Sequence, residues 1–192
     1  MTDRNYQQQQ RKTFGVYIKS MLTMKVPLSI TEVGKNIKQN LEKTISFKTE
    51  GRCIAEGFIK PNSVRVVSYS SGLINGDIIN FQTVFECMVC HPVEGMNIEC
   101  QAKTITKAGI HAEVTEDDVI PVTVFIARDH HFSDKLFASV KEGDQITVRV
   151  IGVRYELNDP YICVIAKLVE PEKKNNTDRQ VRGKQPISIL ED

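Results

Sequence analysis

Hydrophobic and polar positions along the first third of the 192-residue chain change period twice, from a strand pattern to a helix pattern and back. Residues 15–26, "GVYIKSMLTMKV", predict a strand that Pro27 ends. Ser29 and Glu32 then have the spacing of a capping box, which marks the start of a helix. Four apolar residues follow at a spacing of four and predict an amphipathic helix of about four turns. These residues are Val33, Ile37, Leu41 and Ile45.

After Gly51 the apolar residues alternate with polar ones, which is typical of strands. We expect strands over residues 52–60, 63–70 and 77–90. Asn75-Gly76 is a strong signal for a tight turn before the last of them. The stretch "HPVEGM", residues 91–96, reads as a hinge between two parts of the chain.

Five further short strands are expected beyond the hinge, with a connection at 128–144 that could hold a helical turn. Five strands with a helical piece between the third and the fourth are typical of an OB-type barrel. The last two strands form a hairpin around the turn Asn158-Asp159-Pro160. The five expected strands cover residues 97–105, 109–115, 120–127, 145–155 and 160–168.

The two ends of the chain are polar and poor in apolar residues. We therefore expect a flexible leader over 1–13 and a flexible tail over 170–192, although "ISIL" at 187–190 could dock on a partner. The predicted organisation is an α+β domain at 14–92, with one helix on a curved antiparallel sheet, followed by an all-β OB-fold barrel at 93–169.

Composition narrows the class of protein. Apolar residues make up 41% of the chain, enough for a packed core. Lys plus Arg number 25 and Asp plus Glu 24, so the net charge of +1 argues against a strongly basic nucleic-acid coat protein but not against a local basic face. The sequence lacks an apolar run of about 20 residues and the apolar stretch of a signal peptide. The five cysteines read as free thiols in a reducing, intracellular compartment.

Catalytic and metal-binding signatures are weak. Cys87 and Cys90 have a metal-like spacing, but a structural zinc site usually needs a second such pair, and on a strand the two would face opposite ways. "RDHHFSD", residues 128–134, gathers Asp129, His130, His131 and Asp134, which fits an ordinary polar connection better than a metal centre. Asp117-Asp118 is expected to cap a turn. We expect no enzymatic activity, no cofactor and no metal.

Basic side chains interleaved with rings fall on or beside the first four barrel strands. Cations that hold phosphate and rings that stack on bases are what a single strand of RNA requires. A solvated face with a few chance cations would contain the same residue types, and composition alone does not separate the two. The candidate RNA-binding residues are Lys103, Lys107, His111, Phe125, Arg128, Arg149 and Arg154.

Both halves of the chain resemble known modules. "GDQITVRVIGVRYELNDPYICVIAKL" resembles the end of the RNA-binding OB module first described in ribosomal protein S-one, and "IECQAKTITKAGIHAEV" resembles its start. "YIKSMLTMKVPLSITEVGKNIKQNLEKTISFKTEGRC" is similar to the opening of the stalk subunit of multisubunit RNA polymerases, the archaeal E subunit and eukaryotic seventh subunit. Pro92 and Gly95 fall where that family has its hinge. The resemblance covers roughly 15–169.

The resemblance implies a non-catalytic polymerase subunit that acts in transcription, including initiation. It implies docking on the polymerase core near the clamp through a loop at Gly57, Phe58 and Ile59, a small helical partner of the fourth-subunit type, and contact of the barrel with nascent single-stranded RNA. The protein would then be located in the nucleus of a eukaryotic cell, in the cytoplasm of an archaeon, or in the virion or cytoplasmic factory of a large DNA virus. The alternatives are a free OB-type RNA-binding protein of translation or RNA decay and, last, an enzyme that uses the His and Cys groups.

Overall fold

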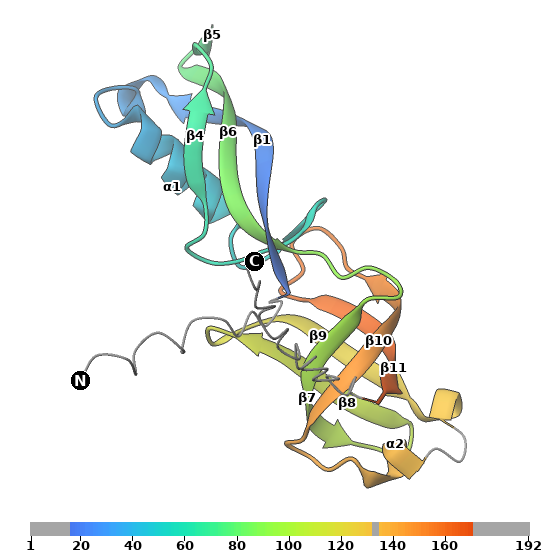
Figure 1. The fold of residues 1–192 in the computed structure, drawn as a ribbon. Coiled ribbons are helices and arrows are strands. Elements are labelled where there is room, and N and C mark those ends of the chain that lie inside the picture. Colours follow the sequence, from blue (N-terminus) through green and yellow to red (C-terminus); the bar gives the residue numbers. More distant parts are fainter. Residues whose placement is uncertain (1–15, 132–134, 171–192) are drawn as a thin grey trace, which may run out of the picture.

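The computed structural model describes residues 16–131 and 135–170. These residues form a six-stranded antiparallel sheet with one long helix on it, followed by a closed five-stranded barrel (Figure 1). The expected leader and tail, with the "ISIL" segment, lie outside the described residues. Among the described helices, none is both long and apolar enough to cross a membrane.

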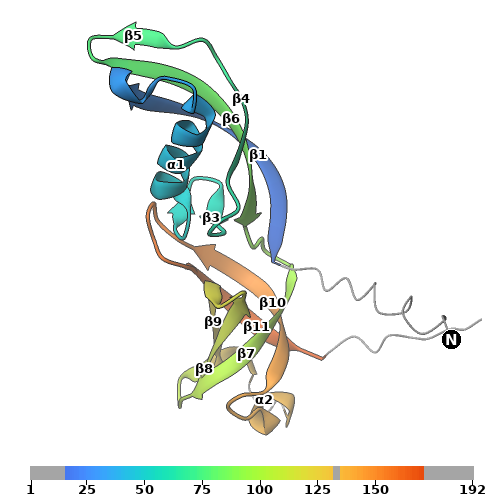
Figure 2. The ribbon, with the colours of Figure 1, turned by 90° about the vertical axis from the view of Figure 1, so that its left-hand side faces the viewer.

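The first sheet is built on two long strands that pair along their whole length, from Tyr17 opposite Cys90 to Ser29 opposite Ile78. The path of the sheet runs β1-β6-β3-β2, and β4 and β5 also pair with β6. Its strands are β1 (Tyr17–Ser29), β2 (Cys53–Ile54), β3 (Gly57–Ile59), β4 (Arg65–Tyr69), β5 (Leu73–Asn75) and β6 (Ile78–Cys90). The short strand β5, which the sequence did not indicate, lies at the end of the sheet away from the barrel (Figures 1 and 2).

The expectation that Pro27 ends the first strand is wrong, because β1 continues to Ser29. Among the described strands, β1 pairs only with β6 and is therefore an edge strand. Proline lacks a backbone N–H, and an edge strand tolerates that loss where the N–H would face away from the neighbouring strand. Pro27 is exposed while its neighbours Val26 and Leu28 are buried, so the alternation continues across it.

The predicted capping box is present, but it caps the short 3-10 helix η1 (Ile30–Glu32) and not the long helix. Helix α1 spans Ile37–Thr49 and starts later than the apolar spacing suggested, since Val33 is the C-cap of η1. Leu41 and Ile45 on α1 are fully buried against the sheet. An antiparallel sheet with a helix on one face is thus present. That this part forms a separate domain ending at residue 92, and that it docks on a polymerase, stay predictions.

The barrel confirms the predicted strand order. Its strands close in the order β10-β11-β9-β8-β7, with β11 and β9 parallel and the other neighbours antiparallel. The predicted connection holds η2 (Arg128–His131) and α2 (Lys135–Ser139), so a helical segment separates the third and fourth strands, as in OB-type barrels. The barrel strands are β7 (Asn97–Ile105), β8 (Gly109–Glu116), β9 (Val119–Ala127), β10 (Gln145–Arg154) and β11 (Ile162–Val169).

The hairpin turn between β10 and β11 joins the barrel to the first sheet. The backbone N–H of Cys53 in β2 donates to the Asp159 carbonyl at 2.8 Å, and the N–H of Asn158 donates to the Cys53 carbonyl at 2.8 Å. Asn158 has a φ of 70°, which asparagine tolerates better than most residues. The turn therefore occupies backbone groups of β2 that would otherwise face solvent.

Side chains fill the seam beneath this turn. Tyr17, Cys53, Phe58 and Cys90 from the first sheet belong to the same core cluster as the barrel interior. Lys60 adds an ion pair across the seam, with its Nζ 2.6 Å from Asp117 Oδ2, and lies over the Tyr17 ring at 5.0 Å. The hydrogen bond that the Lys60 ammonium donates to the Asp117 carboxylate raises the pKa of Lys60. Asp117 and Asp118 both have positive φ and form the β8–β9 turn, which agrees with the turn role expected for them.

Candidate nucleic-acid interface

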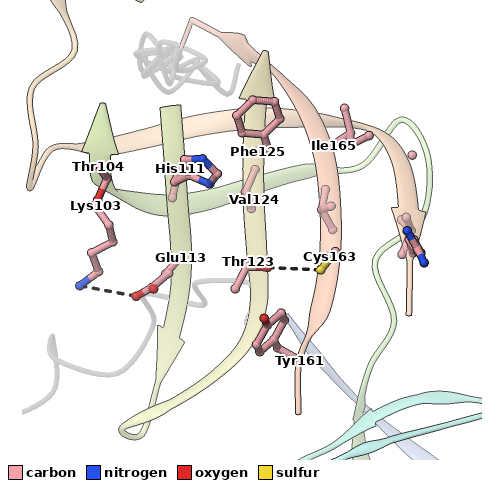
Figure 3. Close-up of a pocket in the computed structure, with 15 residues that line it drawn as sticks. Lys103, Thr104, His111, Glu113, Thr123, Val124, Phe125, Tyr161, Cys163 and Ile165 are labelled. Atoms are coloured by element: carbon pink, nitrogen blue, oxygen red, sulfur yellow. Dashed lines mark hydrogen bonds and ion pairs between the residues drawn. The ribbon is translucent and has the colours of Figure 1, made fainter. Parts of the chain in front are cut away.

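A groove of about 560 Å³ lies on the outer face of the barrel. Its floor is formed by β8, β9 and β11, and residues of β7 and β10 line its two sides (Figure 3). Outward side chains on these strands alternate with residues that fill the barrel, such as Val124, Ile126 and Val164. The groove is thus built from the outward half of the same alternation whose inward half builds the core.

Strand registers align the outward side chains of the groove in two transverse rows. One row carries Thr104, His111, Phe125 and Ile165, each opposite the next across a strand pair. The second row carries Glu113, Thr123, Cys163 and Arg154 in the same way. Successive outward residues on a strand are about 7 Å apart, so the two rows are separated by about this distance. A single nucleobase is large enough to contact side chains of both rows.

The first row contains a pair of rings. His111 and Phe125 are directly opposite on β8 and β9, with ring centroids 4.8 Å apart and planes tilted by 43°. Phe125 is half-buried while Val124 and Ile126 are buried, which confirms the predicted orientation of the third barrel strand. Adjacent rings on an open sheet face offer a platform on which a base can stack.

The second row is polar. The Nζ of Lys103 lies 3.8 Å from Glu113 Oε2, and the Thr123 hydroxyl lies 3.7 Å from the Cys163 sulfur (Figure 3). Lys103 is the extra residue of a bulge in β7, between Ala102 and Thr104. Bulges change the direction of a side chain relative to the regular strand, and here the change brings the ammonium to the groove. At the other side, the Arg154 guanidinium is largely exposed and 3.6 Å from Glu156.

Four of the seven predicted RNA-binding residues line this groove: Lys103, His111, Phe125 and Arg154. The other three lie elsewhere on the barrel. Arg128 donates to the carbonyls of Lys107 and Thr106 at 2.8 and 3.3 Å and lies over the Phe137 ring, so it fastens the β7–β8 loop. The Nε of Arg149 donates to the Gly95 carbonyl at 3.2 Å and holds the hinge segment.

RNA binding by all seven residues stays a prediction, but the geometry gathers only the first four. Sequence reasoning missed the contribution of the last strand. Tyr161, Cys163 and Ile165 line the groove, whereas Ile162 and Val164 between them are buried. This alternation is visible in the sequence, and extending the candidate list from four strands to five would have found these residues.

The three predicted docking residues are buried. Phe58 is 1% exposed and Ile59 0% exposed, and both lie in strand β3, not in a loop. The resemblance implied a docking loop at these positions, whereas the seam between sheet and barrel covers Phe58. A docking role for Gly57, Phe58 and Ile59 stays a prediction, and it would require the surrounding residues to make the contact.

Exposed aliphatic residues gather instead at the far end of the first sheet. Leu73 and Ile74 in β5 are 70% and 69% exposed, and Ile78 at the start of β6 is 47% exposed. Leu73 pairs with Asn80 and Ile74 with Ile79, so these side chains alternate between the two faces of the sheet end. We call these three residues the distal apolar end. Apolar groups exposed on both faces are typical of an element that contacts a partner.

Three side chains that the sequence offered as metal ligands, His131, Cys87 and Cys90, are buried in the protein. His131 is buried, and its Nε2 accepts a hydrogen bond from the Leu168 N–H at 3.1 Å. Cys87 and Cys90 belong to different core clusters, which confirms that they face opposite ways. Burial raises the pKa of Cys87 to about 11 and that of Cys90 to about 12. Among residues 16–131 and 135–170 no group of three metal-ligating side chains is found; Asp134 lies outside these ranges.

Strand order and the helical segment between the third and fourth strands define an OB-type barrel, and its outer face carries a groove with a pair of rings. No protein-family model matches the chain. Among curated proteins, the chain is 26% identical over 173 residues to a protein of Acanthamoeba polyphaga mimivirus that is named as a DNA-directed RNA polymerase subunit. The match covers 81% of this chain and 83% of the mimivirus protein. The similarity spans both the first sheet and the barrel.

Two solved structures are similar to parts of the chain. An uncharacterized protein of Methanocaldococcus jannaschii is 22% identical with a TM-score of 0.33, over 43% of this chain and 99% of that chain. The GSP13 protein of Bacillus subtilis is 15% identical with a TM-score of 0.35, over 53% of this chain and 85% of that chain. Both TM-scores are too low to define the fold of the whole chain.

Proposed function

We propose that this protein is a non-catalytic subunit of a viral DNA-dependent RNA polymerase, and that its barrel groove binds nascent single-stranded RNA. The observation that carries the proposal is the ring row of His111 and Phe125 beside a polar row on the outer face of an OB-type barrel. The similarity to a mimivirus protein named as a polymerase subunit supports the polymerase context. A place on the stalk near the clamp and a helical fourth-subunit-type partner follow from the family resemblance and belong to the same proposal.

The groove has the chemistry of a weak single-strand site. His111 and Phe125 can stack on bases regardless of sequence, because every base has an aromatic face. Lys103 and Arg154 at opposite sides of the groove can each contact a phosphate. Tyr161, which is 41% exposed at one end, supplies a further ring. A protein of net charge +1 would depend on this local arrangement and not on bulk attraction to RNA.

Removal of the ring platform tests RNA binding. Phe125→Ala should weaken binding of the full chain to single-stranded RNA by about 1–3 kcal/mol, because the stacking surface is lost. Phe47→Ala is the matched control, since Phe47 is 80% exposed on α1, away from the barrel. Filter binding over a salt series should give a slope of roughly −1.4 in log affinity against log salt, about 0.7 for each of two cations.

Equal RNA affinity of Phe125→Ala and the unchanged protein would contradict the groove assignment. If Phe125 instead contacts a protein partner, RNA binding by the free chain would stay the same and co-purification of the complex would weaken. The alternative function, a free RNA-binding protein of translation or RNA decay, would give ribosomal or decay components in place of polymerase large subunits when the tagged chain is purified.

Docking on the polymerase core is proposed to use the distal apolar end. Ile74 and Leu73 are exposed, so polar substitution there should leave folding intact. The double variant Leu73→Ser, Ile74→Ser should reduce co-purification of the polymerase large subunits at least about tenfold, as expected for anchors worth about 2 kcal/mol or more. The measurement is quantitative mass spectrometry after the tagged chain is expressed together with the other subunits.

Leu157→Ser is the matched control for docking. Leu157 is 69% exposed in the hairpin turn of the barrel. Its substitution therefore removes the same kind of side chain at a distance from the distal apolar end. Normal polymerase recovery with the double variant would count against docking through this end, and a loss with Leu157→Ser would place the contact on the barrel turn.

A further inference from the structure

The polar row of the groove contains a carboxylate that phosphate binding does not explain. Glu113 is 32% exposed at its side chain and lies on β8 next to the Lys103 ammonium, one row away from the rings (Figure 3). A carboxylate repels the phosphates of a polyanion, so its presence inside a groove for RNA is unfavourable unless it binds something else. Carboxylates bind the N–H groups of bases.

Glu113 and Lys103 keep hydrogen-bonding capacity for a ligand. Their closest atoms are 3.8 Å apart, which makes an ion pair but is too long for a hydrogen bond. An exposed pair of this kind contributes little to stability, so a structural role gives no strong reason for its position. The bulge at Lys103 aims its ammonium at the same side of the groove as the Glu113 carboxylate.

The pair presents one donor beside two acceptors. Among the four RNA bases, guanine alone has the complementary Watson–Crick edge, which is one acceptor, O6, followed by two donors, N1–H and the N2 amino group. The carboxylate can accept both donors, and one N–H of the Lys103 ammonium can donate to O6 while its other N–H groups contact a phosphate. Uracil has the acceptor O2 where guanine has its N2 amino group, and cytosine has acceptors at both N3 and O2. Adenine has the acceptor N1 where guanine has N1–H, and no donor where guanine has its N2 amino group.

The two rows place stacking and edge recognition at compatible positions. His111 and Glu113 are two residues apart on the same outward face of β8, about 7 Å along the strand. A base that stacks on His111 and Phe125 therefore directs one edge toward Glu113 and Lys103. Bases of a single strand are unpaired, so this edge is free to be read.

We propose that the groove reads guanine in single-stranded RNA, with the ring stacked on His111 and Phe125 and the Watson–Crick edge bound by Glu113 and Lys103. This inference rests on the proposed RNA-binding function and adds a base preference to it. Glu113 is then the residue that determines specificity, while the rings supply affinity that is independent of sequence.

The test compares oligonucleotides of about twelve residues, within the length that one OB fold covers. Fluorescence anisotropy with the full chain measures binding to oligouridine, to oligouridine with two central guanines, and to the same RNA with inosine, which lacks the N2 amino group. The guanine RNA should bind about tenfold tighter than oligouridine, and inosine should lose most of that gain, as expected for a bidentate contact.

The variant Glu113→Gln should abolish the preference for guanine without weakening the binding of oligouridine, because an amide cannot accept both donors. Glu99→Gln is the matched control, since Glu99 is exposed on β7 outside the groove and carries the same charge. Thermal unfolding of both variants verifies that folding is unchanged. An equal rise in affinity for all RNAs in both variants would mean that Glu113 acts only through its charge, which would overturn the inference.

Further outcomes separate this inference from the proposed function. Equal and measurable binding of oligouridine and guanine RNA by the unchanged protein would overturn the guanine preference and leave RNA binding intact. Failure to bind any RNA would overturn both. Competition with free GMP tells whether the groove binds guanine within an RNA strand or as a free nucleotide. We expect GMP to compete poorly. Displacement of RNA by GMP at the concentration of the RNA itself would indicate a nucleotide pocket and overturn the inference.

Discussion

Phe58→Ala should lower the free energy of unfolding by about 3–5 kcal/mol, the cost of replacing a buried phenylalanine with alanine. The ring is 1% exposed and packs in the core cluster that joins the first sheet to the barrel. The cavity would open between the two parts, where Cys53 and Cys90 are also fully buried. Urea unfolding followed by circular dichroism measures the change.

Phe47→Ala is the control for Phe58→Ala, since it removes the same side chain from an exposed site and should change stability by less than about 0.5 kcal/mol. The outcome also bears on docking. A Phe58→Ala variant that keeps its stability but fails to assemble with the polymerase would indicate that the ring leaves the seam to contact the core enzyme. Loss of both stability and assembly is the result expected from the structure.

Gly57→Ala should destabilise the protein by roughly 2–6 kcal/mol, from about 1–3 for strained backbone and about 1–3 for steric overlap. Gly57 has a φ of 129°, and a Cβ there would lie 2.3 Å from the Cys90 carbonyl oxygen. That oxygen belongs to the long strand β6 and cannot move without displacing the seam. Thermal unfolding of the full chain measures the loss.

Gly76→Ala separates the two causes. Gly76 has a φ of 62° in the turn before β6, and a Cβ there would have no atom within 4 Å. Its substitution should cost only the backbone contribution, about 1–2 kcal/mol. Equal effects at both glycines would contradict the close approach of β3 to β6.

The β10–β11 hairpin has two structural roles. Its strands complete the groove through Arg154 and Cys163, and its turn binds the backbone of β2. The Tyr155 hydroxyl adds a hydrogen bond to the Ala55 carbonyl at 3.1 Å beside this turn. The proposed RNA groove and the first sheet are therefore joined through the same hairpin.

The sequence by itself determined the barrel and four of the residues that line its groove. Period-two alternation predicted all five barrel strands and the outward direction of Phe125, because each strand separates a packed core from solvent. The same reasoning could not tell cations that line the groove from cations that fasten loops. Lys103 and Arg154 line the groove, whereas Arg128 and Arg149 donate hydrogen bonds to loop carbonyls. A cation on a strand has the same local pattern in both cases.

Only the tertiary structure decided which residues meet across strands and which are covered by the other part of the chain. The alignment of His111 with Phe125 and Ile165 depends on strand register and on barrel closure, and a shift of one residue would point each of them inward. Phe58 was predicted to be a docking side chain because the family resemblance implies a docking loop at Gly57, Phe58 and Ile59. The barrel turn at Asn158, about a hundred residues later, is hydrogen-bonded to Cys53, the strand partner of Phe58, and short-range pattern carries no signal for such a distant contact.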